Sequence, residues 1–192
     1  TLKGEPGLRI PNMLDAAVDG TFKAIYIQGE DIAQSDPNTR HVTAGLAAME
    51  CVIIQDLFLN ETASYAHVFF PGTSFLEKDG TFMNGERRVQ RIRAAVSPRG
   101  NAKSDLEIIC DLAAAMGFEK DFAFKTAEEV WDEVRAVWPP GYGITYDRIE
   151  KAGIQWPCPD VDHPGTEVLH GESFSNGVAA ALKRIKYRPT KE

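Results

Sequence analysis

Three short apolar runs, each followed by small polar or acidic residues, constrain the fold of this chain most. The runs with their polar clusters are 23–27 (KAIYI) then 28–31 (QGED), 51–54 (CVII) then 55–56 (QD), and 67–70 (HVFF) then 71–74 (PGTS). Continuous apolar runs of this length are typical of strands that are buried on both faces of a parallel sheet. Open α/β sheets bind ligands beyond the carboxyl ends of their strands. The pattern therefore predicts an α/β fold with a ligand-binding crevice at one end of a parallel sheet.

Amphipathic segments around these runs predict flanking helices. The expected helices cover residues 11–18, 39–50, 105–116, 127–137 and 145–152, with one helical turn near 62–65. Ser104 and Thr126 are well placed to cap two of them, and Gly117 to end one. A short strand over 81–83 and the alternating segment 87–94 predict an antiparallel hairpin. The residues after 152 are expected to form irregular loop.

Composition limits the possible partners of the chain. It has 192 residues, 43% of them apolar, and a net charge of −7. This acidic balance, with a pI near 5.2, argues against nucleic acid or an anionic membrane as the main partner. Neither a membrane span nor a signal-peptide core is apparent, so we expect a soluble cytoplasmic protein. The first residue is Thr1 rather than Met, which is compatible with an excised fragment.

Common catalytic and metal-binding motifs are missing from the sequence. Neither a G-x-G-x-x-G fingerprint nor a phosphate-binding G-x-x-x-x-G-K-[ST] loop is present. Cys51, Cys110 and Cys158 are far apart, and the four histidines do not form metal-ligand pairs. We therefore predict no catalytic residue and no metal ligand within these residues.

The strand ends and the turns beyond them supply candidates for ligand binding. Asp31 and Asp56 could accept hydrogen bonds from a guanine edge or from ribose, and Gln55 could face the same crevice. Asp also favours turns and helix starts for purely local reasons. Lys78 could neutralise a diphosphate, or could be an ordinary exposed turn residue. Asp105 is explained by the dipole of the helix that it begins, although the same position could reach a ligand.

A set of segments in order along the chain resembles the large subunits of molybdenum or tungsten oxidoreductases that bind bis-molybdopterin guanine dinucleotide. These segments are 4–7 (GEPG), 24–31 (AIYIQGED), 52–56 (VIIQD), 66–71 (AHVFFP), 77–90 (EKDGTFMNGERRVQ) and 103–105 (KSD). Residues 153–159 (GIQWPCP) and 163–166 (HPGT) are similar to the formate dehydrogenase branch in particular.

The resemblance implies which residues line the pterin guanine dinucleotide. The matching positions are Gly29, Asp31, Ser35, Gln55, Asp56, Lys78 and Asp105. Thr73 or the backbone is expected to replace a hydroxyl side chain that some relatives carry at the position of Gly72. Many relatives also have Asn-Pro where this chain has Asp31 and Ile32. Residues 84–90 are expected to hold a second lobe against the first.

The resemblance also implies a division into lobes. Residues 1–74 with 104–125 would form a Rossmann-like lobe that binds the pterin guanine dinucleotide, and residues 75–103 with 126–170 a smaller α+β lobe. Residues 171–192 would link to a missing final domain.

The activity implied is formate oxidation to carbon dioxide, with electrons passing through the pterin to iron–sulfur centres. The iron–sulfur cysteines and the metal-ligating Cys or selenocysteine of the family lie outside this chain, so we expect the chain alone to be inactive. Expected partners are the rest of the large subunit and iron–sulfur or flavin electron-transfer subunits. The alternatives are another molybdopterin oxidoreductase such as nitrate reductase, a scaffold lobe of a respiratory NADH dehydrogenase large iron–sulfur subunit, and a self-contained small binding module.

Overall fold

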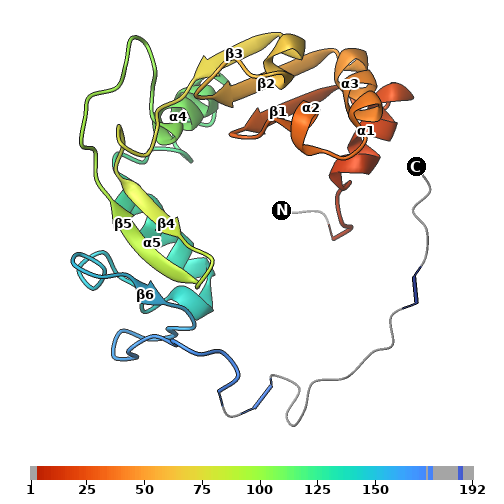
Figure 1. Ribbon diagram of the computed structural model, residues 1–192. Helices are drawn as coiled ribbons and strands as arrows, with labels where there is room; N and C mark the ends of the chain where they lie inside the picture. Colours follow the sequence, from red (N-terminus) through yellow and green to blue (C-terminus); the bar gives the residue numbers. More distant parts are fainter. Residues whose placement is uncertain (1–3, 172, 175–185, 188–192) are drawn as a thin grey trace.

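A parallel sheet at one end of the molecule is followed by a smaller antiparallel sheet at the other (Figure 1). The computed structural model describes residues 4–171, 173–174 and 186–187. Most of the predicted link 171–192 therefore lies outside the described residues. The mixed α/β architecture with a parallel sheet and a smaller α+β part confirms the predicted fold class.

The parallel sheet consists of β1 (Ala24–Gln28), β2 (Cys51–Asp56) and β3 (Val68–Pro71) in that spatial order. All three strands run in the same direction, as the apolar runs predict. Gln28 pairs in register with Gln55, and Asp56 with Pro71. This register places the polar residues that end each run at one edge of the sheet.

Helices α1 (Ile10–Val18) and α3 (Thr39–Ala48) cover one face of this sheet. The core between them and the sheet contains Leu14, Ala17, Ile27, Ile32, Val42, Leu46, Met49, Val52 and Ile54. Gly45 allows the two helices to approach closely, because a Cβ atom there would lie 2.8 Å from Cδ2 of Leu14. Burial of these side chains supplies the main driving force for this part of the fold.

Helix α4 (Asp105–Ala115) returns to the parallel sheet after the excursion through the second sheet. Ser104 caps it in a reciprocal arrangement with Glu107, since each side chain bonds the backbone N–H of the other residue. The backbone N–H of Lys103 donates to the carbonyl of Pro71 at 3.1 Å, next to the end of β3. The first turn of α4 is thereby fixed beside the carboxyl ends of the strands.

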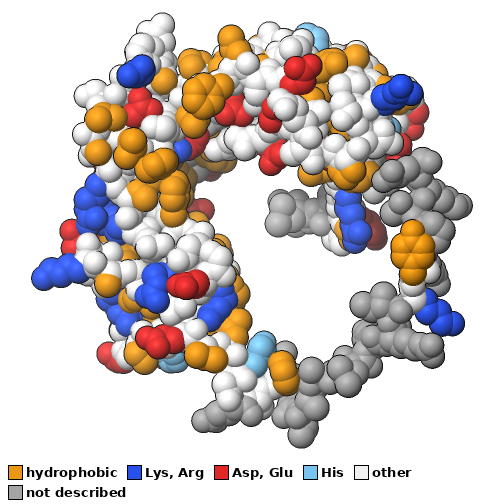
Figure 2. Space-filling view, in the orientation of Figure 1, with side chains coloured by type: hydrophobic (Ala, Val, Ile, Leu, Met, Phe, Trp, Pro, Cys, Tyr) orange, Lys and Arg blue, Asp and Glu red, His pale blue; other side chains and the backbone are white. Residues whose placement is uncertain are grey.

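The second sheet is antiparallel, with β4 (Gly80–Met83), β5 (Arg88–Ile92) and β6 (Ile154–Gln155) in that order. The predicted hairpin is confirmed, and α5 (Ala127–Val137) begins at its predicted Thr126 cap. The associated core contains Val89, Trp131, Ile144, Tyr146, Ile149 and Cys158. In Figure 2, Lys and Arg side chains lie on the visible surface of the region that contains the antiparallel sheet.

Strand β6 lies in the segment expected to be irregular loop. Arg87, at a φ of +66°, donates from its guanidinium to the carbonyls of Trp156, Thr166 and Glu167. Arg88 donates to the carbonyl of Gly153 at 3.0 Å. These bonds hold residues 153–167 against the hairpin.

The predicted helix over 145–152 is wrong, because this segment forms turns and bends. Its backbone is organised by Arg148, whose guanidinium donates to the carbonyls of Gly143 and His163, both at 2.6 Å. Ile144 and Ile149 are buried at the same time. The Arg148 side chain thus links this segment to residues on both sides of it, while the segment's backbone makes turn bonds such as that from the Ile149 N–H to the Thr145 carbonyl at 3.2 Å.

Three short helices complete the described elements. The predicted turn near 62–65 is confirmed as the 3-10 helix η1 (Thr62–Tyr65). The sequence did not predict two of them, α2 (Ile32–Ser35) and the 3-10 helix η2 (Pro139–Gly141). At the start of α2, the carbonyl of Asp31 accepts hydrogen bonds from the backbone N–H groups of Gln34 and Ser35.

Candidate functional site

A pocket of about 440 Å³ lies beyond the carboxyl ends of β1 and β2, where the sequence predicts a crevice. Its lining includes Gly29, Gln55, Asp56, Thr73, Lys78 and Asp105, and also Gln28, Leu57, Gly72, Ser74, Phe75 and Phe82. Six of the eight predicted site residues are therefore brought together. They come from two strand ends, from the loop after β3 and from the first turn of α4.

A hydrogen-bonded network of four side chains reaches this pocket, and three of the four line it. The Tyr26 hydroxyl donates to Oε1 of Gln55, and Nε2 of Gln55 donates to Oδ1 of Asp105 at 2.6 Å. The ammonium group of Lys78 pairs with the other carboxylate oxygen of Asp105. Gln55 is only 1% exposed, whereas Asp105 keeps 33% of its side chain exposed. The network therefore runs from the half-buried Tyr26 on the edge strand β1, through the buried Gln55 amide, to an accessible ion pair.

Tyr26 is a member of this network that the sequence reasoning missed. Its place inside an apolar run indicates packing, and nothing in its neighbourhood along the chain points to Gln55 or Asp105. Burial raises the pKa of the Tyr26 hydroxyl, and the negative charge of Asp105 adds to the effect. The hydroxyl is therefore protonated and able to donate at neutral pH.

The remaining polar groups of the pocket differ in how many hydrogen bonds they already make within the protein. The carboxylate of Asp56 accepts from the N–H of Leu57 at 2.6 Å and from Nδ2 of Asn60 at 2.9 Å. Gly29 has a φ of +62° and open space where a side chain would begin, so a ligand can approach its backbone closely. The buried hydroxyl of Thr73 has no hydrogen-bond partner among the residues that the structure describes.

Asp31 and Ser35 do not belong to the lining of this pocket. The carboxylate of Asp31 accepts from the N–H of Thr62 at 3.0 Å, from the Thr62 hydroxyl at 2.5 Å and from Nε2 of Gln34 at 2.7 Å. These bonds, led by the Thr62 hydroxyl, lower the pKa of Asp31. The Ser35 hydroxyl donates to Glu30 at 2.5 Å. In this structure the two side chains tie α2 to its surroundings, and their predicted contact with a cofactor stays a prediction.

Two exposed aromatic residues form an apolar side of the pocket. Phe75 and Phe82 have ring centroids 6.3 Å apart, and 54% and 47% of these residues respectively are exposed. The sequence reasoning did not single them out, because an exposed Phe has no local signature. Their position suits contact with a flat ring system.

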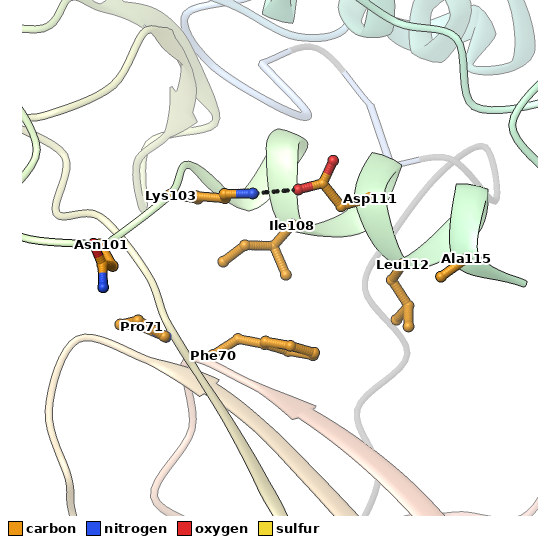
Figure 3. Close-up of a pocket in the computed structure, with 8 residues that line it drawn as sticks. All are labelled: Phe70, Pro71, Asn101, Lys103, Ile108, Asp111, Leu112 and Ala115. Atoms are coloured by element: carbon orange, nitrogen blue, oxygen red, sulfur yellow. Dashed lines mark hydrogen bonds and ion pairs between the residues drawn. The ribbon is translucent and has the colours of Figure 1, made fainter.

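A second cavity, of about 320 Å³, lies between β3 and α4 (Figure 3). Its lining is mainly apolar, with Phe70 and Pro71 facing Ile108 and Leu112 across it. Its one lysine, Lys103, pairs with Asp111 at 2.6 Å, and this partner raises the pKa of the lysine. This cavity lacks the combination of carboxylates, amide and glycine backbone that lines the pocket at the strand ends.

A parallel α/β sheet with a polar pocket beyond its strand ends is the arrangement in which open α/β proteins bind their ligands. Comparison with known protein families identifies the family of the chain, which the fold alone does not. The molybdopterin oxidoreductase family model matches residues 1–115, and the chain belongs to this family.

Individual relatives include several oxidoreductase subunits. The F420-dependent formate dehydrogenase subunit alpha of Methanocaldococcus jannaschii is 42% identical, with all of this chain aligned to 28% of that protein. Formate dehydrogenase H of Escherichia coli is 38% identical over 93% of this chain and 26% of its own length. The assimilatory nitrate reductase catalytic subunit of Bacillus subtilis is 39% identical over 95% of this chain and 27% of its own length. The chain thus spans about a quarter of these relatives.

A solved structure supports the fold. Acetylene hydratase from Pelobacter acetylenicus superposes with a TM-score of 0.59, covering 74% of this chain and 20% of that protein at 23% identity. The family implies a pterin cofactor, and the pocket contains groups that fit a polar, phosphate-bearing ligand. Lys78 is a cation suited to phosphate, Asp105 and Asp56 offer carboxylate oxygens, and Thr73 has an unused hydroxyl.

None of the helices in the described ranges combines the length and apolar character needed to cross a membrane.

Proposed function

We propose that this chain forms one wall of a pterin guanine dinucleotide site in a molybdenum- or tungsten-dependent formate dehydrogenase. The observation that carries this proposal is the gathering of Lys78, Asp105 and Gln55 with the Gly29 backbone in one pocket beyond the strand ends. Family membership and the likeness to the two formate dehydrogenase proteins described above support it.

Each end of the nucleotide would meet groups of matching chemistry. The N–H groups of guanine would donate to the carboxylates of Asp105 and Asp56, which retain acceptor capacity beyond their present bonds. The ammonium of Lys78 would neutralise phosphate oxygens, with the Thr73 hydroxyl and the backbone beside Gly29 as further donors. Asp31 and Ser35, which lie outside the pocket lining, would join the site at its outer edge.

This chain would contribute binding and orientation, since the described residues offer no nucleophile or general acid–base group with a clear reaction geometry. The cofactor, when bound, supplies the metal-centred chemistry that removes two electrons and a proton from formate to leave carbon dioxide. The iron–sulfur cluster, the metal ligand and the electron-transfer partners would then come from the rest of the large subunit and from other subunits. The isolated chain should therefore not oxidise formate.

We also propose the lobe boundaries that follow from the resemblance, with residues 1–74 and 104–125 as the nucleotide-binding lobe. Residues 75–103 and 126–170 would be the smaller lobe. The return of α4 to the end of β3, through the Lys103 and Pro71 backbone bond, supports the assignment of α4 to the first lobe.

Nitrate reduction is the second candidate, because the Bacillus subtilis relative is 39% identical over almost the whole chain. The experiment is purification of the complete protein that contains this sequence, followed by acid release of guanosine monophosphate and assays with formate and with nitrate. Bound guanine nucleotide with formate oxidation is the expected result. Nitrate reduction alone would select the second candidate, and the absence of guanine nucleotide would favour a scaffold lobe such as that of an NADH dehydrogenase subunit.

A further inference from the structure

The Tyr26 hydroxyl is the end of the network opposite the Lys78–Asp105 ion pair, although Tyr26 itself does not line the candidate pocket. It lies on β1, half-buried, two residues before the strand ends at Gln28. Because side chains alternate along a strand and β1 pairs in register with β2, Tyr26 and Gln55 lie on the same face of the sheet. That is also the face from which Gln55 reaches α4.

The direction of each hydrogen bond in this network is set by the carboxylate at its outer end. An ionised Asp105 can only accept, so the nitrogen end of the Gln55 amide must face it. The oxygen end of the amide therefore faces Tyr26, and the hydroxyl must be the donor. A phenylalanine at this position would leave the buried Gln55 oxygen without this donor.

Loss of that donor changes what holds Gln55 in place. The Gln55 side chain is almost fully buried, so its oxygen has little access to water as a replacement partner. The amide could then rotate and lose its alignment with Asp105. Asp105 would keep Lys78 as a partner but would lose the neutral donor on its other oxygen.

We propose that Tyr26 is a positioning residue for the guanine nucleotide site, acting through Gln55 to orient the Asp105 carboxylate. This inference rests on the proposed function, because it assigns Asp105 to the bound nucleotide. Tyr26 touches no ligand in this scheme. Its effect on affinity must therefore pass through the Gln55 amide.

The test is a double-mutant cycle on nucleotide affinity. The complete protein is produced in cells that cannot make molybdopterin, and guanosine diphosphate binding is measured by titration calorimetry with adenosine diphosphate as the reference. Tyr26→Phe should weaken guanosine diphosphate binding about three- to tenfold, the effect of one neutral hydrogen bond. Gln55→Leu should weaken it at least as much, and Tyr26→Phe should have no further effect in the Gln55→Leu background.

The matched control is Tyr65→Phe, which makes the same change at a residue packed against the core of the first lobe. It should leave the affinity unchanged. Tyr26→Phe removes one oxygen and creates no large cavity, and the melting temperature checks that each variant is folded.

Each other outcome has a distinct meaning. The inference is overturned if Tyr26→Phe binds like the wild type, or if it weakens binding equally with and without Gln55. If the unmodified protein shows no preference for guanosine over adenosine diphosphate, the proposed function fails instead.

Discussion

Gln55 on β2 and Asp105 on α4 are 50 residues apart in sequence, and their side chains are joined by a hydrogen bond of 2.6 Å. This bond connects the end of a central strand to the first turn of a helix that returns from a separate sheet. Asp105 is held from two sides, by Gln55 and by Lys78, while a third of its side chain remains exposed. The carboxylate is therefore fixed but still accessible to a ligand.

Replacing Asp105 by Asn should weaken cofactor retention. The change removes the negative charge, and hydrogen bonds to charged groups are stronger than neutral ones, so we expect a loss of about ten- to a hundredfold in affinity. The measurement is guanosine monophosphate released per mole of purified complete protein after extensive dialysis. Asp111→Asn is the matched control on the same helix, because Asp111 pairs with Lys103 at the other cavity. Equal retention by both variants would argue against a role for Asp105.

Replacing Lys78 by Met should reduce affinity for the phosphate part of the ligand. The methylene stem is largely preserved while the charge is lost. Cofactor-free complete protein should bind guanosine diphosphate about tenfold more weakly, with a smaller effect on guanosine itself. Lys103→Met, which alters the lysine at the other cavity, should bind both like the wild type. An equal loss for guanosine and its diphosphate would place Lys78 away from the phosphates.

The cap of α4 should control how firmly Asp105 is positioned. Ser104→Ala removes the side-chain oxygen that accepts from the Glu107 N–H at 3.3 Å and should destabilise the first turn by about 1 kcal/mol. Hydrogen exchange followed by mass spectrometry should then show faster exchange in residues 104–108. Ser104→Thr preserves the hydroxyl and should exchange like the wild type. Unchanged exchange in Ser104→Ala would mean that the cap does not limit opening of this turn.

The bonds to Asp31 predict a specific pH dependence. Because the Thr62 hydroxyl and the other donors lower the Asp31 pKa in the folded protein, this carboxylate stabilises the fold above its unfolded pKa, near pH 4. The contribution is lost as pH falls through the lowered folded pKa. Asp31→Asn should therefore melt at a lower temperature than the wild type at pH 7, and the difference should shrink below pH 4.

Asp36→Asn is the control for this pH series, since the Asp36 carboxylate accepts none of the hydrogen bonds found in the described residues. Its melting temperature should follow that of the wild type throughout. A difference between Asp31→Asn and wild type that stays constant down to pH 2 would contradict the assigned cause.

Local patterns predicted much of the fold. The three apolar runs indicated the parallel sheet, and Ser104 and Thr126 marked two helix starts, because strand burial and helix capping depend on neighbouring residues in the chain. The crevice followed from the same pattern, since parallel strands end at one edge of the sheet. Six candidate residues consequently lie around one pocket.

The features that sequence reasoning missed depend on contacts between distant segments. Tyr26 joins the site only because α4 returns over the sheet and carries Asp105 to Gln55. The segment 145–152 has residues that suit a helix, but it forms turns, and its Arg148 side chain bonds the carbonyls of Gly143 and His163 on either side of it. Strand β6 forms because Arg87 and Arg88 hold residues 153–167 against the hairpin. None of these arrangements has a signature in local spacing.

Binding of the guanine nucleotide at the strand ends can be observed directly in an electron cryo-microscopy structure of the complete protein with its cofactor bound. We expect a guanine ring within hydrogen-bonding distance of the Asp105 carboxylate, with the diphosphate beside the ammonium of Lys78. A guanine dinucleotide bound elsewhere, with the pocket at the ends of β1 and β2 filled by protein side chains, would contradict it.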